Sequence, residues 1–336
     1  MISQVEGTRL EAARSGDQQQ FSELIEPYRR QLQVYCYRLL GSLQDAEDAV
    51  QETMLRAWRR LDTFEGRASF RAWLYKIATN VSLDILDRAA RRGLPTTLYD
   101  TADANSLDVK TINDPIWLDP FPDDWLDETT PSTEAHYALR ESVTLAFMTA
   151  LHVLPPRQRA VLVLCDVLDW KASEVATLLE ITISAVSSAL HRARSTLTKH
   201  YQFTTTERTT ISPSTRSLLE RYIRAWETTD VAGLVSLLKE DATFAMPPSA
   251  AWFQGREAIG KFFGSRIFSG GVSLRLRPIK VSGEPGFASY LYDPETNRFQ
   301  AHAIHVLTVD GSHLAALTTF LNPSLFLHFG LADMLN

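Results

Sequence analysis

Five side chains with hydrogen-bonding tips stand close together in the second half of the sequence: Ser184, Ser187, Ser188, His191 and Arg192. Hydroxyl, imidazole and guanidinium groups read base edges and hold phosphates in DNA complexes. Three- and four-residue spacings put most of these side chains on polar faces of a helix. The chemistry suggested here is hydrogen-bonded recognition of a nucleic acid.

The elements that must position these residues form a predicted helix-turn-helix. A short helix over EVATLL follows Ser173 as its cap, and residues 180–182 make a turn. A longer helix starts at Thr182 or Ser184 and continues to Leu197, with Val186 facing the core. The second helix of such a unit can enter the major groove.

Three further helices are predicted near the N-terminus. Apolar residues recur at three- and four-residue spacing from Phe21 to Leu39, and Gly41 ends that helix. Ser42 caps a second helix, and Ser69 opens a third that runs to about residue 92. The apolar stripe of the third helix is Phe70, Trp73, Leu74, Ile77, Val81 and Ile85.

Two strings in these helices, DAEDAVQETMLRAW and FRAWLYKIATNVSLD, resemble region 2 of sigma-70 type factors, in particular of the extracytoplasmic function (ECF) class. The resemblance implies a helix face that grips the clamp helices of the RNA polymerase largest subunit. Its residues are Asp45, Asp48, Gln51, Glu52, Arg56 and Trp58. Acceptors beside an aromatic anchor are usual in an interface hot spot. The alternative is that Trp58 and Leu55 are core and the acids only cap the helix.

The third helix and the loop before it correspond, by the same resemblance, to the part that melts and reads the −10 promoter element. Separated strands need cations for phosphates and polar groups for bases. The candidates are Arg67, Ser69, Arg71, Lys76, Asn80, Asp84 and Arg88, with Asn80 as the best candidate for a base contact. Trp73 and Phe70 fit the apolar stripe better than a stacking role.

The helix-turn-helix is similar to sigma region 4 through LPPRQRAVLVL and ALHRAR. The resemblance implies contacts with the −35 element and the polymerase flap tip. The residues expected to bind the −35 DNA are Thr182, Ser184, Ser187, Ser188, His191 and Arg192. Ser187 and Ala189 stand where many ECF factors carry Lys or Arg, so the electrostatic grip of this helix should be weaker.

The last third of the chain predicts two helices followed by antiparallel strands, an α+β domain. Together with DATFAMPPSAAWFQGREAI, it looks like the SnoaL-like branch of the NTF2-like superfamily, and WLDPFPDDWL and NPSLF are similar to segments of the ECF group with this extension. Some such domains are enzymes. Asp241, His302, His305, Tyr290 and Tyr292 are the candidates for acid/base groups, but no acid-base pair is evident, which favours a regulatory or ligand-binding domain.

The charge distribution adds a linker to this organisation. The chain has 336 residues and a net charge of −6, and residues 96–140 hold ten Asp or Glu against two Lys or Arg. Two tryptophans, Trp117 and Trp125, interrupt the acid, so this segment should dock on something. It is expected to enter the basic polymerase cleft, or to dock on the C-terminal domain in the free protein.

The sequence thus predicts a multidomain protein with two all-α helical domains followed by an α+β SnoaL-like (NTF2-like) domain. The expected boundaries are 1–95 (region 2), 96–140 (acidic linker), 141–203 (region 4), 204–214 (short linker) and 215–336 (SnoaL-like domain). No apolar run is long enough for a membrane span and no signal peptide is seen, which predicts a cytoplasmic protein.

The expected function is that of an ECF sigma factor, not an enzyme, modulated by its C-terminal domain. Its expected partners are core RNA polymerase, promoter DNA and a small ligand of the C-terminal domain, with no cofactor and no metal; Cys36 and Cys165 are expected as thiols. The alternatives are a ligand-responsive helix-turn-helix regulator and, less favoured, a SnoaL-type enzyme.

Overall fold

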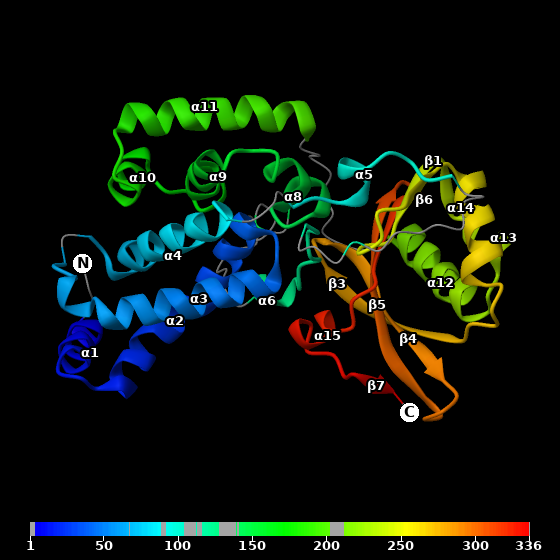
Figure 1. The fold of residues 1–336 in the computed structure, drawn as a ribbon, viewed down its shortest axis with the longest axis horizontal. Coiled ribbons are helices and arrows are strands. Elements are labelled where there is room, and N and C mark those ends of the chain that lie inside the picture. The colour runs from blue at the N-terminus through cyan, green and yellow to red at the C-terminus, as the bar shows by residue number, and fades with distance from the viewer. Residues whose placement is uncertain are drawn as a thin grey trace. The chain divides into compact units, whose positions relative to one another are not determined.

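A computed structural model describes residues 4–66, 68–88, 92–103, 112, 116–127, 139, 141–201 and 212–335. The chain divides into two compact units. The first contains residues 1–92 and 124–202, and the second contains residues 93–123 and 203–336. Figure 1 shows the first as helices and the second as a curved sheet with helices.

The N-terminal part of the first unit is a helical bundle whose ends follow the expected caps. Gly41 ends α2 with a φ of 73°, the left-handed conformation that glycine adopts without strain. Ser42 and Ser69 accept hydrogen bonds from Asp45 N and Ala72 N and so begin α3 and α4. The elements are α1 (Gln4–Arg14), α2 (Gln18–Leu40), α3 (Leu43–Arg59), a 3₁₀ turn η1 (Leu61–Thr63) and α4 (Phe70–Leu86).

Two details of this bundle differ from the prediction. The helix α1 was not predicted, and α4 ends at Leu86, so Arg88 lies in the following turn rather than on the helix. The apolar stripe of α4 was predicted well, since Phe70, Leu74 and Val81 are buried. Trp73 is half-buried and lies in an aromatic cluster with Phe64 and Phe70, in agreement with its assignment to the stripe.

The second part of the first unit contains the predicted helix-turn-helix. Thr182 caps α11 by accepting from Ala185 N, as expected. The prediction for α10 was wrong by two residues, because Lys171 and not Ser173 precedes it, and the Glu174 carboxylate accepts from Lys171 N. The elements are α6 (Asp124–Asp127), α8 (Leu145–Leu151), α9 (Pro156–Leu162), a π turn η2 (Val163–Val167), α10 (Ala172–Leu179) and α11 (Ile183–His200).

A buried arginine joins these two parts of the first unit. Arg159, 3% exposed, donates to the carbonyl oxygens of His152 and Leu154 at 3.3 and 3.2 Å and also to that of Leu39. Leu39 lies in the last turn of α2 and His152 caps the end of α8. A cation at carbonyl groups that helix ends leave unpaired satisfies both the hydrogen bonds and the helix dipoles. Arg159 therefore stabilises the packing of the helix-turn-helix part on α2.

The second unit is an α+β domain with one mixed sheet. Its strand order is β2-β1-β6-β5-β4-β3, all neighbours being antiparallel except β1 and β6, and β7 pairs with β5. The strands are β1 (Leu238–Ala245), β2 (Trp252–Gln254), β3 (Leu274–Val281), β4 (Glu284–Asp293), β5 (Arg298–Asp310), β6 (His313–Phe320) and β7 (Met334–Leu335). The helices are α12 (Pro213–Glu227), α13 (Val231–Ser236), α14 (Arg256–Phe262) with a π turn η3 (Phe263–Ile267), and α15 (Leu325–His328).

One face of this sheet and the helices α12 to α14 enclose an aromatic core. Tyr222 and Trp226 of α12 pack with Phe244 of β1, Phe287 of β4 and Phe263 of the η3 turn. The predicted helices and long strands were found, whereas β2, α14, α15 and β7 were not predicted. These four elements have seven residues or fewer, too few for a hydrophobic period to show.

The acidic segment is part of this second unit as far as Asp123. Phe121 accepts from Ser282 N through its carbonyl (2.8 Å), and Asp123 N donates to Lys280 O (3.4 Å), so the segment pairs with the end of edge strand β3. At the opposite edge, Ala102 N donates to Trp252 O of β2 (2.8 Å). The expected docking on the C-terminal domain is therefore confirmed for this stretch, which includes the short helix α5 (Pro95–Leu98).

The segment is also closed on itself. Gly93 pairs with Trp117, and the indole nitrogen of Trp117 donates to Ile112 O at 3.0 Å. Leu118 and Phe121 are fully buried. Trp125, by contrast, lies in α6 of the first unit, where the Arg30 guanidinium carbon is 4.6 Å from its ring centroid. The two tryptophans thus dock in different units.

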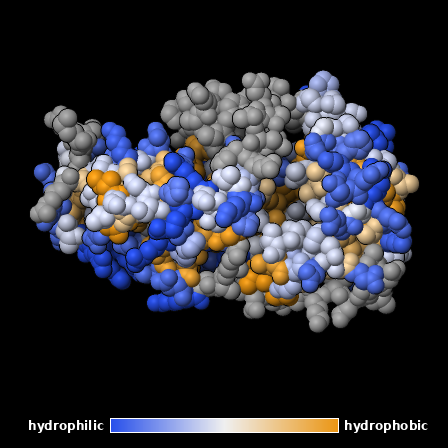
Figure 2. Space-filling model, turned by 90° about the horizontal axis from the view of Figure 1, so that it is seen from above, coloured by the Kyte–Doolittle hydropathy of each residue, from blue (hydrophilic) through white to orange (hydrophobic). Residues whose placement is uncertain are grey.

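The surface is mostly hydrophilic in the view of Figure 2, with hydrophobic residues in separate small patches. Within the described ranges, no single helix has the length and apolar character needed to cross a membrane. The bent pair of α10 and α11 passes that test jointly, at an angle of 105°, and this pair is the helix-turn-helix.

Candidate protein and nucleic-acid interfaces

The outer face of α3 carries the residues expected to bind polymerase. Asp48 and Gln51 are exposed, and Asp45, Glu52 and Trp58 are half-buried. The ring of Trp58 packs 5.0 Å from that of Phe21, so this side chain is anchored in the bundle. Asp45 is held by Arg92, whose Nη2 lies 2.5 Å from Oδ2. The face is thus a fixed acidic surface with exposed acceptors.

Leu55 is the residue of this face that the candidate set missed. Its side chain is 41% exposed, so the alternative that made it core is wrong. An exposed leucine among acids offers apolar contact area, and the buried core of a protein interface is more apolar than its rim. The signal in the sequence was its position on the same helical face, three and four residues from Gln51, Glu52 and Trp58.

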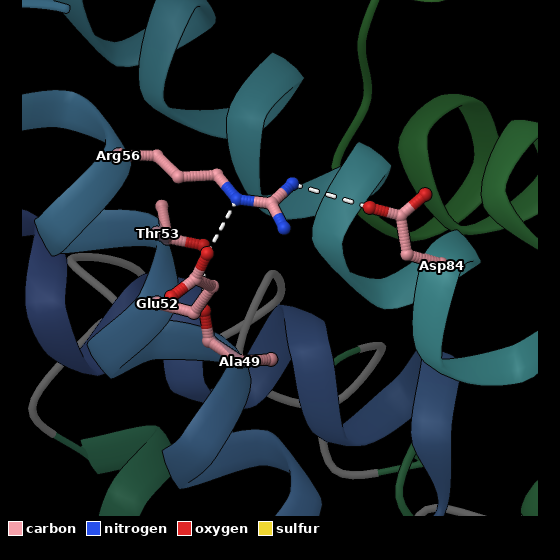
Figure 3. A network of polar contacts seen from close by, with 5 residues as sticks. All are labelled: Ala49, Glu52, Thr53, Arg56 and Asp84. Carbon is pink, nitrogen blue, oxygen red and sulfur yellow. Dashed lines mark hydrogen bonds and ion pairs between the residues drawn. The ribbon is translucent and has the colours of Figure 1, made fainter. Parts of the chain in front are cut away.

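An ion-pair network links α3 to α4 (Figure 3). Arg56 Nε donates to Glu52 Oε1 at 2.6 Å and its Nη1 donates to Asp84 Oδ2 at 3.2 Å. The hydrogen bond with Glu52 raises the pKa of Arg56, so its charge is permanent. Asp84 was expected on the DNA surface and Arg56 on the polymerase surface, and the structure brings the two together. Arg56 therefore belongs to both the expected polymerase surface on α3 and the expected DNA surface on α4.

Some of the −10 candidates form an exposed polar face on α4, whereas others lie before this helix. Lys76, Asn80 and Asp84 recur every four residues on α4, with Asn80 and Asp84 exposed, and Arg88 is exposed in the next turn. Ser69 uses its hydroxyl as the cap of α4, and Arg67 lies outside the described residues. A polar face that ends in a cation is suited to a phosphate backbone with extruded bases.

The outer face of α11 carries the −35 candidates. Ser184, Ser187, Ser188, His191 and Arg192 are all exposed, as the prediction required. Thr182 is different, because its hydroxyl accepts from Ala185 N and is occupied as the cap of α11. Ile183, 55% exposed, adds an apolar contact at the same helix end that the candidate set did not include. Arg194 of the same helix is paired with Asp166 at 2.6 Å.

Of the acid/base candidates of the second unit, Asp241 and Tyr292 are exposed, His302 is half-buried, and Tyr290 and His305 are buried. Asp241 is exposed on β1, and the Tyr292 hydroxyl donates to Asn297 near the β4–β5 turn. His305 is buried against Tyr222 of α12 and Ser289 of β4, partners that the sequence spacing did not reveal. The two surface depressions described for this unit, of about 360 and 800 Å³, are lined by other residues.

Three family models match consecutive parts of the chain. Sigma-70 region 2 matches residues 24–92, sigma-70 region 4 matches residues 144–197, and the SnoaL-like domain matches residues 219–316. The helical bundle, the helix-turn-helix and the C-terminal sheet described above are the folds of these three parts. The chain is therefore a sigma-70 type factor with a SnoaL-like C-terminal domain.

Full-length relatives define the family more closely. The chain is 42% identical to the ECF RNA polymerase sigma factor SigG of Mycobacterium tuberculosis over 96% of this chain and 86% of that protein. It is 29% identical to SigJ of the same species over 90% and 92% of the two chains. The crystal structure of SigJ shares the fold, with a TM-score of 0.55, 24% identity and coverage of 91% and 97%. This chain belongs to the ECF RNA polymerase sigma factors.

Proposed function

We propose that the outer face of α3 binds core RNA polymerase, that α4 reads the −10 element and that α11 reads the −35 element. The observation that carries the α3 assignment is its acidic face, on which Asp48, Gln51 and Leu55 are exposed and from which the Arg56 ion pair leads to α4. The expected contacts are the clamp helices for α3 and the flap tip for the helix-turn-helix. A factor that acts on polymerase and chromosomal DNA works in the cytoplasm.

Titration of the protein with core polymerase, followed by promoter-specific run-off transcription, tests the α3 assignment. Asp48→Lys reverses a charge on the proposed face, and Glu11→Lys makes the same change on α1. We expect Asp48→Lys to weaken core binding at least tenfold, because a like-charge contact at an interface costs several kcal/mol, about 1.4 kcal/mol being tenfold. Glu11→Lys should bind as the unchanged protein. Equal effects of the two substitutions would remove the assignment.

A matched pair on α11 tests the −35 assignment. His191→Ala and Arg192→Ala should each lower initiation, with base discrimination changing by about 1–3 kcal/mol at one promoter position. Lys199→Ala, also exposed but in the last turn of α11, is the control. A −35 preference that neither substitution changes would rule out this face.

We infer that the SnoaL-like domain regulates the factor and is not an enzyme. In support, Asp241 and His305 do not meet, and the acidic segment 93–123 is folded into this domain. Since an acidic strand suits the basic polymerase cleft, the proposal is that the domain and polymerase compete for this segment, with any small ligand acting on that balance. Cross-links from Trp117 should reach the domain in free protein and the cleft in holoenzyme, and cross-links that stay on the domain in holoenzyme would contradict competition.

A further inference from the structure

The helix-turn-helix part of the first unit covers a small area of α4 with two side chains. The ring of Trp170, in the turn before α10, lies 5.1 Å from the ring of Tyr75 between centroids. The guanidinium carbon of Arg71 lies 5.4 Å from the Trp170 ring centroid and 5.3 Å from that of Tyr75. Two residues of α4 thus hold an aromatic ring by stacking and by a cation–π contact.

The second covering side chain is a carboxylate. Glu180 Oε1 lies 2.6 Å from the ammonium nitrogen of Lys76, next to Tyr75 in the sequence. The hydrogen bond from Lys76 lowers the pKa of Glu180. Arg71 and Lys76, both expected to bind the separated promoter strand, are therefore already engaged by the helix-turn-helix.

A flat ring on an aromatic and a guanidinium, followed by an anion on an ammonium, is the set of contacts that a nucleotide makes. Proteins that hold single strands stack bases on aromatic side chains and Arg, and they pair phosphates with cations. Trp170 supplies the flat ring and Glu180 supplies the negative charge. The pair has the chemistry of a base and a phosphate.

The backbone at Glu180 supports a role for its side chain. This residue ends α10 with a φ of 57°, in the left-handed region that favours glycine or asparagine. A glutamate at that place strains the turn, and the turn itself needs no carboxylate. The ion pair with Lys76 explains why a glutamate stands at position 180, which the termination of α10 does not explain.

The contact also leaves two donors unsatisfied. Arg71 Nε and Trp170 Nε1 are buried without a hydrogen-bond partner. A buried donor without an acceptor is costly, and phosphate oxygens are strong acceptors for Arg. Trp170 and Glu180 are thus an imperfect occupant that nucleic acid can displace.

We propose that Arg71, Lys76 and the ring of Tyr75, which is 1% exposed between Tyr35 and Trp170, form a nucleotide-binding surface on α4 that Trp170 and Glu180 occupy in the free protein as an internal substitute for the promoter strand. The inference rests on the proposed −10 role of α4 and adds Tyr75 as its stacking residue. The helix-turn-helix and the −10 strand then compete for one surface, so the free factor holds single-stranded DNA weakly.

The test measures binding of a fluorescein-labelled thymidine 12-mer to the full-length protein without polymerase, by fluorescence anisotropy. Trp170→Ala should tighten binding by about fivefold or more, since a base–aromatic contact is worth at least that factor, and Glu180→Gln should tighten it by about twofold, since the ion pair with Lys76 is exposed. Adding Lys76→Gln to Glu180→Gln should abolish the gain. Asp166→Asn is the control, because it removes one negative charge and the ion pair with Arg194 in the same domain.

Unchanged or weaker binding by both Glu180→Gln and Trp170→Ala overturns the proposal, as does an equal gain from Asp166→Asn. Glu180→Gln is an exposed substitution that keeps the fold, so it decides the matter if Trp170→Ala unfolds. Core binding and run-off transcription of the same proteins separate the two hypotheses. A protein that transcribes normally but shows no gain refutes only this inference, whereas an unsubstituted protein that does not bind core refutes the proposed function.

Discussion

The hydroxyl oxygen of Tyr222 lies 2.7 Å from Nδ1 of His305, and Nε2 of the same imidazole lies 3.0 Å from Ser289 Oγ. All three side chains are buried. Burial, and to a smaller extent the charge of His302, lowers the pKa of His305 to about 3, and burial raises the pKa of Tyr222 well above its usual value. The core of the SnoaL-like domain therefore holds a neutral imidazole with both nitrogens paired.

Acid should destabilise this domain through His305. In the unfolded chain this histidine has an ordinary pKa of about 6.5. Between about pH 6 and pH 3 the unfolded chain therefore binds a proton at His305 that the folded domain does not bind. The stability that the neutral His305 contributes is fully present above pH 6.5. Below that pH the free energy of unfolding falls by up to about 1.4 kcal/mol per pH unit. Urea unfolding followed by tryptophan fluorescence from pH 7.5 to pH 4.5 measures this slope.

His305→Gln is the control for that experiment, because glutamine keeps hydrogen-bonding groups but does not titrate. The free energy of unfolding of this variant should fall less steeply with acid, by up to about 1.4 kcal/mol per pH unit, the slope that uptake of one proton gives. Carboxylates contribute equally to both proteins and cancel in the comparison. The same slope in both proteins would show that His305 titrates normally in the fold.

The Arg56 ion pair predicts a coupling between α3 and α4. Arg56→Glu should lower both core binding and promoter opening, because it repels Glu52 and Asp84 together. Adding Asp84→Arg should restore part of promoter opening, with a coupling of about 0.5 kcal/mol, or roughly twofold, for a pair this exposed. A double-mutant cycle on open-complex formation measures it, and strictly additive effects would show that the pair is not coupled.

The fully buried Phe121 predicts how firmly the acidic segment is held. Phe121→Ala should release the segment from β3 and cost the SnoaL-like unit about 3–5 kcal/mol, the usual cost of emptying a phenylalanine site. Faster hydrogen exchange at the Ser282 amide, which donates to Phe121 O, reports the release. Core binding through α3 should remain.

Leu327→Ala is the matched control, since Leu327 is 80% exposed in the same unit. It should change neither exchange at Ser282 nor transcription. Slow exchange at Ser282 in Phe121→Ala would mean that backbone pairing alone holds the segment.

Arg159 predicts a large stability effect from a buried residue whose hydrogen bonds reach none of the candidate binding residues. Arg159→Met keeps most of the length of the side chain but leaves the carbonyls of Leu39, His152 and Leu154 without their donor. The expected loss is about 3 kcal/mol, because buried acceptors stay unpaired. Thermal unfolding followed by circular dichroism measures it, and an unchanged midpoint would show that water replaces the guanidinium.

The helical parts were predictable because their signals are local. Ser42, Gly41 and Ser69 act within a few residues of themselves, and the strings around Asp45 and Phe70 identified the family. The exposed faces of α3 and α11 followed from helical spacing. The first residue of α10 was predicted wrongly because the capping side chain, that of Glu174, lies inside the helix and not before it.

Contacts between distant residues were beyond the sequence. Nothing in the spacing of Trp170 and Tyr75, of Arg56 and Asp84, or of Tyr222 and His305 shows that they meet. Such pairs depend on how helices and strands pack. The aromatic residues of the acidic segment did indicate docking, but composition alone could not predict that Trp117 and Trp125 are buried in different units.

The discontinuity of the second unit has a consequence for synthesis on the ribosome. Residues 93–123 emerge well before the strand that they pair with, since about 150 residues separate Asp123 from Leu274, the first residue of β3, and at about 5–20 residues per second their synthesis takes roughly ten seconds or more. During that interval Phe121 has no strand to dock on, because its partner Ser282 follows β3, while the bundle before it is already complete in sequence. Each new molecule therefore passes through a period in which region 2 and the acidic segment exist but the SnoaL-like domain does not, so the proposed regulation by that domain cannot yet act.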